Sequence, residues 1–222
     1  MSTPRWTVRP EGSNWGDFGP DDQLGRLNLL TPEKVRQGIA QVQEGRVFCL
    51  SLPLDYPGGN LVAPHRKPPR REATVRHGQS YTHYSFSNEG AFDDCGCDDA
   101  VLLHTQYSTQ WDSLKHIGCR FDPHGDGQEA FVYYNGYQAA REVLGPQEEQ
   151  GRPSALGIDN AAATGLQGRG VMVDLHRLCG NQREYIGYDG LMRAMELTGA
   201  EVEPGDILCL HTGFAQCVLD MQ

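Results

Sequence analysis

The sequence predicts a mixed domain of the α/β or α+β class, because short apolar strands alternate with a few helices and long loops. Two runs of aliphatic residues, Val171–Leu175 and Ile207–Thr212, have the composition of buried strands. Between them, Leu191, Ala194 and Thr198 recur at helical spacing. A chain of 222 residues buries a core of ordinary size, so a single domain is the simplest organisation.

The first helix is predicted to begin after Thr31, whose hydroxyl group precedes Pro32 and Glu33. These three residues suit the N-cap, the first helical position and an acidic first turn. Apolar side chains then recur at helical spacing as far as Val42, and Gly45 is the predicted end of the helix.

The segments around this helix have less regular patterns. Residues 13–30 are rich in Gly and Asp, which predicts a structured loop. Val47–Leu54 has the composition of a strand. Residues 55–99 are broken repeatedly by Pro and Gly, which predicts a long loop that is either functional or partly disordered. A short strand, Val101–Thr105, is predicted to follow this loop.

The second helix is predicted to begin with Asp189 as its N-cap and to stop at Gly199. Pro204, Gly205 and Asp206 then predict a turn into the last strand.

The composition argues against two classes of partner. A net charge of -10 and a pI near 5.2 would repel nucleic acid. No apolar run is long enough to span a bilayer, and the N-terminal residues lack the pattern of a targeting signal. Seven cysteines without regular spacing predict reduced thiols. We therefore expect a cytoplasmic protein that binds a small-molecule substrate, with neither nucleic acid nor a membrane as partner.

The strongest candidate site lies in residues 106–116, which read QYSTQWDSLKH. Gln106, Gln110 and Asp112 are separated by even numbers of residues, so an extended segment would direct their side chains to one face. His116 follows Asp112 by four residues and would return to the same site if the chain turns helical there. The spacing of five other histidines singles none of them out: His65, His77, His83, His176 and His211.

Residues 106–116 resemble the motif H-x-G-T-H-x-D-x-P-x-H of the cyclase family, which includes bacterial kynurenine formamidase and isatin hydrolase. Thr109, Asp112 and His116 match the motif, whereas Gln106 and Gln110 stand where the family has its first two histidines. Further segments resemble recurring family segments in the same order, namely residues 14–32, 133–136, 169–174 and 204–213.

The resemblance implies a cyclase-family domain over residues 1–222, with a central, partly barrel-like β-sheet flanked by helices. Residues 1–45 would form an N-terminal loop and helix extension. Family members continue beyond the strand that ends in Thr-Gly, so we expect a C-terminal part of the domain to be missing after residue 222. Family members usually assemble as a homodimer or a homotetramer.

The resemblance also implies a metal-assisted hydrolase, similar to an arylformamidase, that cleaves a C–N amide or lactam bond of a small aromatic substrate. His116 would be the general acid and base. Asp112 would be a metal ligand, with Gln106 and Gln110 in the other ligand positions, and Tyr56 would contact the substrate. The implied cation is Mn²⁺, Mg²⁺ or Zn²⁺, and amide oxygens suit the first two better than zinc.

Two alternatives stay open at this point. The first is a metal-free cyclase or dehydratase in which His116 and Asp112 move protons. The second is a non-catalytic protein that keeps a small-molecule pocket after losing its metal.

Overall fold

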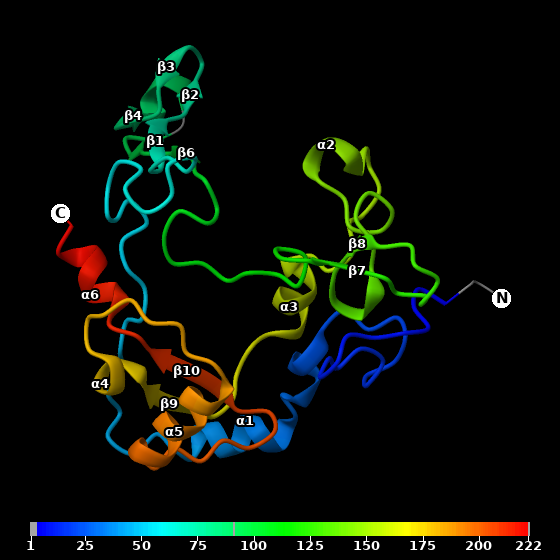
Figure 1. Cartoon of the computed structure of the whole chain (residues 1–222). Coiled ribbons are helices and arrows are strands. Elements are labelled where there is room, and N and C mark those ends of the chain that lie inside the picture. The colour runs from blue at the N-terminus through cyan, green and yellow to red at the C-terminus, as the bar shows by residue number, and fades with distance from the viewer. Residues whose placement is uncertain (1–3, 91, 222) are drawn as a thin grey trace. The chain divides into compact units, whose positions relative to one another are not determined.

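A computed structural model describes residues 4–90 and 92–221 (Figure 1). Contacts within the chain divide it into two compact units. Unit 1 consists of Met1–Val47 and Trp111–Thr212, and unit 2 consists of Phe48–Gln110 and Gly213–Gln222. Both units mix helices with strands, so the α/β character predicted from the sequence is confirmed.

Unit 1 contains most of the helices. Its α-helices are α1 (Pro32–Ile39), α2 (Pro146–Glu149), α3 (Ile158–Thr164), α4 (Leu175–Cys179) and α5 (Tyr188–Thr198). Its short 3-10 helices are η1 (Gly25–Leu29) and η3 (Tyr134–Gly136), and its strands are β7 (Cys119–Phe121), β8 (Ala130–Val132), β9 (Gly170–Asp174) and β10 (Ile207–His211).

Helix α1 begins as predicted and ends early. The Thr31 hydroxyl group accepts a hydrogen bond from the Lys34 N–H at 3.4 Å, and Pro32 occupies the first helical position. The helix ends at Ile39, so the predicted end at Gly45 is wrong. Helix α1 has no buried residue, and Val42 is 71% exposed. Helices in proteins are stabilised mainly by packing of an apolar face, and α1 buries no side chain. The apolar spacing beyond Ile39 therefore does not extend the helix.

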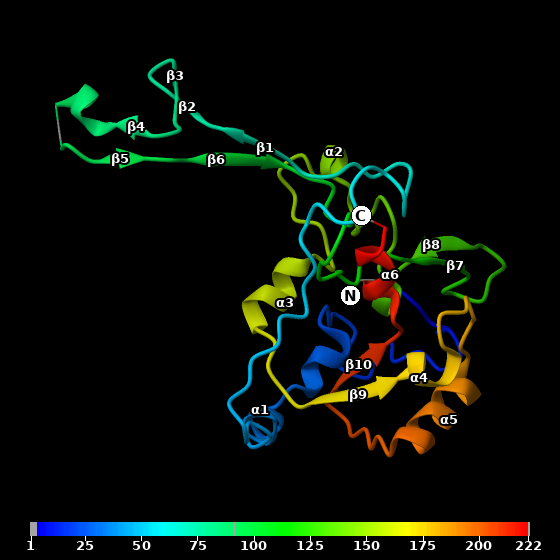
Figure 2. The same cartoon turned by 90° about the vertical axis from the view of Figure 1, so that its left-hand side faces the viewer.

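Strands β9 and β10 form a parallel pair that confirms two predicted strands within one residue at their ends. Helices α4 and α5 connect the two strands, and Figure 2 shows β9 and β10 side by side with both helices nearby. Val173 of β9 is fully buried in a cluster with Leu175 and with Ala194 of α5. This cluster packs the carboxyl end of β9 against α5.

The C-terminal end of α5 confirms the predicted stop, and its N-terminal end corrects the predicted N-cap. Gly199 has the left-handed backbone conformation of a C-cap, as predicted. The N-cap is Gly187, and Asp189 lies in the first turn, so the predicted role of Asp189 as N-cap is wrong by two residues. An acidic side chain is favourable at either position because both lie at the positive end of the helix dipole.

The structured loop predicted for residues 13–30 is held by one buried amide. Asn135 is fully buried, and its Nδ2 donates to the carbonyl oxygens of Gly19, Pro20 and Asp22 at 2.9 to 3.2 Å. Its Oδ1 accepts from the Gly16 N–H at 2.9 Å. One side chain therefore satisfies four backbone groups of the loop.

Unit 2 contains paired strands where the sequence predicted only a loop. Within its described residues, the strands are β1 (Arg70–Ala73), β2 (Val75–Arg76), β3 (Gln79–Ser80), β4 (Tyr84–Ser85), β5 (Cys95–Gly96) and β6 (Asp99–Leu102). The pairs β1 with β6, β2 with β3 and β4 with β5 are antiparallel. The unit also contains helix η2 (Phe86–Glu89) and helix α6 (Phe214–Leu219).

Two predicted strands need correction. Val47–Leu54 is not a strand, and Val47 and Leu50 are 95% and 81% exposed. Its composition suits a strand, but within the described residues no neighbouring strand pairs with it. The strand predicted for Val101–Thr105 is β6, which begins at Asp99 and ends at Leu102.

The strands of the described ranges pair only two at a time, in five separate sheets. The partly barrel-like central sheet implied by the family resemblance therefore stays a prediction. Among the helices that the structure describes, none has both the length and the apolar character needed to cross a membrane.

Candidate functional site

The segment of residues 106–116 crosses the boundary between the two units. Gln106 and Gln110 belong to unit 2, whereas Asp112 and His116 belong to unit 1. The segment is not extended, because the Tyr107 N–H donates to the His104 carbonyl oxygen at 2.9 Å in a turn. The prediction that alternate side chains project from one face of a strand is therefore wrong.

Asp112 and His116 are the two predicted site residues that the structure brings together. His116 Nε2 lies 3.9 Å from Asp112 Oδ2. The chain returns through a turn, in which the His116 N–H donates to the Ser113 carbonyl oxygen at 3.1 Å, rather than through a helix. The side chains are 30% and 43% exposed, so both can reach a solvent-borne ligand. The pair therefore places a carboxylate beside an imidazole at a position open to solvent.

The first half of the segment is fastened to the loop that carries Tyr56, within unit 2. The Leu52 N–H donates to Thr109 Oγ1 at 2.9 Å, and Ser108 Oγ donates to the Pro53 carbonyl oxygen at 3.0 Å. The Tyr107 hydroxyl group donates to the Gly59 carbonyl oxygen at 2.8 Å. Bonds on both sides of Tyr56 along the chain therefore tie its loop to the residues around Gln106.

A fixed positive charge adjoins Gln106. Arg66 Nη1 donates to the Gln106 carbonyl oxygen at 2.6 Å. A guanidinium group at this distance weakens the attraction of the same segment for a cation. Amide and carboxylate oxygens are donors that Mn²⁺ and Mg²⁺ prefer, so Gln106, Gln110 and Asp112 stay predicted ligands of such an ion.

A second group of potential ligands lies in unit 1, at the carboxyl ends of β9 and β10. One ligand atom each of Asp174, His176 and His211 lies within 4.8 Å of the others. His211 Nδ1 is 2.8 Å from Asp174 Oδ1, and the two imidazole rings meet edge to face with centroids 5.5 Å apart. The Asp174 carboxylate also caps α4 by accepting from the Arg177 N–H at 3.0 Å.

The neighbouring groups fix the ionisation of Asp174. The hydrogen bond with His211, together with the bond from the Arg177 N–H, holds the pKa of the Asp174 carboxyl group below its ordinary value. The carboxylate form is therefore the one present near neutral pH. Reasoning from the sequence missed this cluster, because His176 has only Asp174 close by in sequence and His211 lies 35 residues further along the chain.

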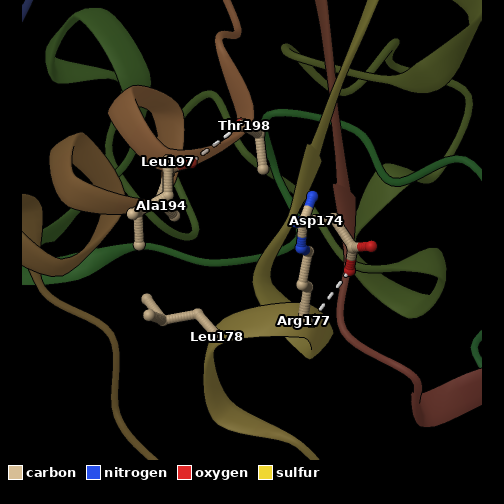
Figure 3. A pocket seen from close by; sticks show the side chains of 6 residues that line it. All are labelled: Asp174, Arg177, Leu178, Ala194, Leu197 and Thr198. Carbon is tan, nitrogen blue, oxygen red and sulfur yellow. Dashed lines mark hydrogen bonds between the residues drawn. The ribbon is translucent and has the colours of Figure 1, made fainter.

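Cavities in the described part of unit 1 lie away from the predicted site residues. A cavity of about 160 Å³ adjoins Asp174 and lies between α4 and α5, lined by apolar and polar side chains (Figure 3). A polar cavity of about 370 Å³ is lined in part by Arg141, Glu142, Arg152 and Asp159. The first is smaller than the roughly 300 Å³ at which drug-sized ligand pockets begin, so only a small group would fit there.

Comparisons with known proteins identify similar sequences and structures. The family model described as "Putative cyclase" matches residues 27–220. A crystal structure described as that of a novel cyclase superposes with a TM-score of 0.70 at 29% sequence identity. The match covers 95% of this chain and 65% of that one, so the chain spans less than two thirds of the similar structure's length. No curated protein matches the sequence.

Proposed function

The chain belongs to the cyclase family, since the family model matches most of its length, and on this premise we propose that it is a hydrolase of C–N bonds. Its substrate would be a small aromatic amide or lactam. The observation that carries this proposal is the pairing of His116 with Asp112 in a segment that resembles the family motif. Hydrolysis forms a C–O bond from water and breaks the C–N bond, so a proton must be taken from water and given to the leaving nitrogen.

His116 is suited to that proton transfer. An imidazole titrates near neutral pH, so it can accept a proton from the attacking water and return it to nitrogen. Asp112 Oδ2 lies 3.9 Å from Nε2 of this imidazole. Tyr56, on the loop tied to the Gln106 end of the segment, would place its ring against the aromatic part of the substrate.

The metal of this proposal would be Mn²⁺ or Mg²⁺, with Asp112 as a ligand. When bound, such an ion polarises a carbonyl group and favours ionisation of water. A metal-free cyclase or dehydratase is the second candidate, favoured by the guanidinium group of Arg66 next to Gln106.

Turnover measurements on a panel of aryl formamides and aryl lactams test the proposal. His116→Ala should lower kcat/KM by at least about 100-fold, the lower end of what acid–base catalysis contributes. His104→Ala is the matched control, because His104 precedes the segment and is exposed, and this variant should keep the parent rate. Equal rates for the parent protein and His116→Ala would contradict the assigned role.

Chelation distinguishes the two candidates. If a metal acts at this segment, exhaustive treatment with EDTA abolishes turnover and added Mn²⁺ restores it. Full activity after chelation would instead support the metal-free candidate. Binding of the panel without turnover would identify a protein that keeps only a pocket.

The proposal includes two properties of the whole protein, a cytoplasmic location and assembly as a homodimer or homotetramer. Light scattering on the purified protein measures its molar mass and so checks the assembly. Multiples of 24.6 kDa other than two or four would contradict it.

A further inference from the structure

We propose that Asp174, His176 and His211 form a binding site for one divalent cation of the Zn²⁺ and Co²⁺ class. The site is separate from residues 106–116 and does not rest on the proposed function. It lies wholly within unit 1, at the carboxyl ends of two parallel strands.

The pairing of β9 with β10 is what brings the ligands together. His211 and Asp174 are register partners, so their side chains project from the same face of the strand pair. Helix α4 begins directly after Asp174, and His176 therefore lies in its first turn. The carboxyl ends of parallel strands are where α/β proteins commonly bind ligands. The three ligands thus lie at the ends of two paired strands and in the first turn of one helix.

The distances allow coordination with small side-chain movements. Tetrahedral zinc with bonds of about 2.0 Å holds its ligand atoms roughly 3.3 Å apart. His211 Nδ1 and Asp174 Oδ1 are 2.8 Å apart and share a proton, which the cation would replace. The ligand atoms of the cluster lie within 4.8 Å of one another, so small shifts of the Asp174 and His211 side chains toward His176 can close the set. Binding would release the shared proton to solvent.

Asn181 orients His176 in the way that ligand histidines are commonly oriented. His176 Nε2 lies 2.7 Å from Asn181 Oδ1, so the ring donates its Nε2 proton to this oxygen. The tautomer that results carries its lone pair on Nδ1. Ligand histidines nearly always donate their second ring nitrogen to an oxygen, which fixes the tautomer and the ring plane. This bond is an observation independent of the cluster itself.

The donor set and the exposure define the class of ligand. Two imidazoles and one carboxylate suit zinc, cobalt or nickel better than magnesium or calcium, which prefer oxygen donors. The Asp174 and His211 side chains are 38% and 48% exposed. Three protein ligands in this setting leave at least one coordination position open to solvent, as in zinc sites that are not purely structural.

Titration of the full chain with Zn²⁺ and Co²⁺ after removal of bound metal tests the proposal. Calorimetry should give one equivalent of Zn²⁺ for the parent protein. His211→Gln should weaken this binding by at least about 100-fold, because it removes a ligand. Asn181→Ala should weaken it by roughly 10-fold, since loss of an orienting partner typically costs 10- to 100-fold in affinity.

His124→Gln is the matched control. His124 is an exposed histidine of the same unit outside the cluster, and its replacement should leave Zn²⁺ affinity unchanged. Asp112→Asn should also leave it unchanged, which separates this site from the one assigned under the proposed function. Loss of binding in Asp112→Asn with retention in His211→Gln would overturn the proposal.

A measurement on the parent protein covers the case in which a variant fails to fold. With nitrogen-15 labelled histidine, Zn²⁺ should shift the ring resonances of two of the eight histidines. No saturable binding by the parent protein, or shifts spread over all histidines, would overturn the proposal.

Discussion

Replacing Asp206 with Asn should lower the free energy of unfolding of unit 1 by about 3 to 5 kcal/mol, the range for breaking a buried ion pair. The Asp206 side chain is fully buried in the turn before β10. Its Oδ1 accepts from Arg169 Nε and from Lys34 Nζ, both at 3.0 Å. Its Oδ2 accepts from the Glu203 N–H at 2.7 Å and from Arg169 Nη2. One carboxylate thus links α1, the start of β9 and the turn before β10.

The expected loss in the free energy of unfolding follows from the hydrogen bonds that an asparagine side chain cannot accept. Asparagine keeps one acceptor oxygen, and its NH₂ group would face two donors in place of the other oxygen. Hydrogen bonds to charged groups contribute about 1.5 to 3 kcal/mol each, and a neutral bond contributes about 1 kcal/mol. Arg169 and Lys34 are only 19% and 13% exposed, so water replaces the lost carboxylate poorly. The loss of one bond of each kind therefore gives about 2.5 to 4 kcal/mol, which overlaps the range for breaking a buried ion pair.

Urea denaturation followed by tryptophan fluorescence measures this cost. The three tryptophans, Trp6, Trp15 and Trp111, all belong to unit 1, so the signal reports on that unit. Glu203→Gln is the control, because the Glu203 side chain is 54% exposed and its ion pair with Lys34 should contribute less than about 1 kcal/mol. A cost below about 1 kcal/mol for Asp206→Asn would refute the assignment of Asp206 as the buried link.

Two further predictions concern unit 1. The pKa of Asp206 is held far below its ordinary value, chiefly by the hydrogen bond from Arg169. Its stabilising contribution should therefore be complete above about pH 4, the ordinary range of the unfolded carboxyl group, and decline below it. Urea midpoints at several pH values should show the difference between parent and Asp206→Asn shrinking as the pH falls below 4. Asn135→Ala should lower the free energy of unfolding by about 2 to 4 kcal/mol, because four backbone groups lose their buried partner; hydrogen exchange unchanged at residues 16–22 would contradict this.

Local signals in the sequence predicted parts of the fold well. The cap at Thr31 and the stop at Gly199 depend on hydrogen bonds within a few residues, so their patterns suffice. The family resemblance was also confirmed, because it used several segments in a shared order. Val47–Leu54 shows the limit of such reasoning, since a strand needs a partner that composition does not supply.

One candidate site could be predicted from the sequence and the other could not, because the two depend on contacts of very different separation along the chain. The pairing of Asp112 with His116 follows from a four-residue spacing, which a turn satisfies as well as a helix does. Asp174 and His211 are far apart in sequence and become neighbours only through the parallel register of β9 with β10. Without that register, an aspartate and two histidines at unremarkable positions carry no signal.

The register of β9 and β10 has a consequence for the order of folding. Asp174 and His211 are separated by the crossover through α4 and α5, and they become neighbours only where β10 pairs with β9. A cation that bridges the two strands can therefore bind only to chains in which this crossover is complete. Spectral changes of Co²⁺ during refolding would then time the closing of the β9–β10 pair, and added cation would slow its reopening rather than speed its formation.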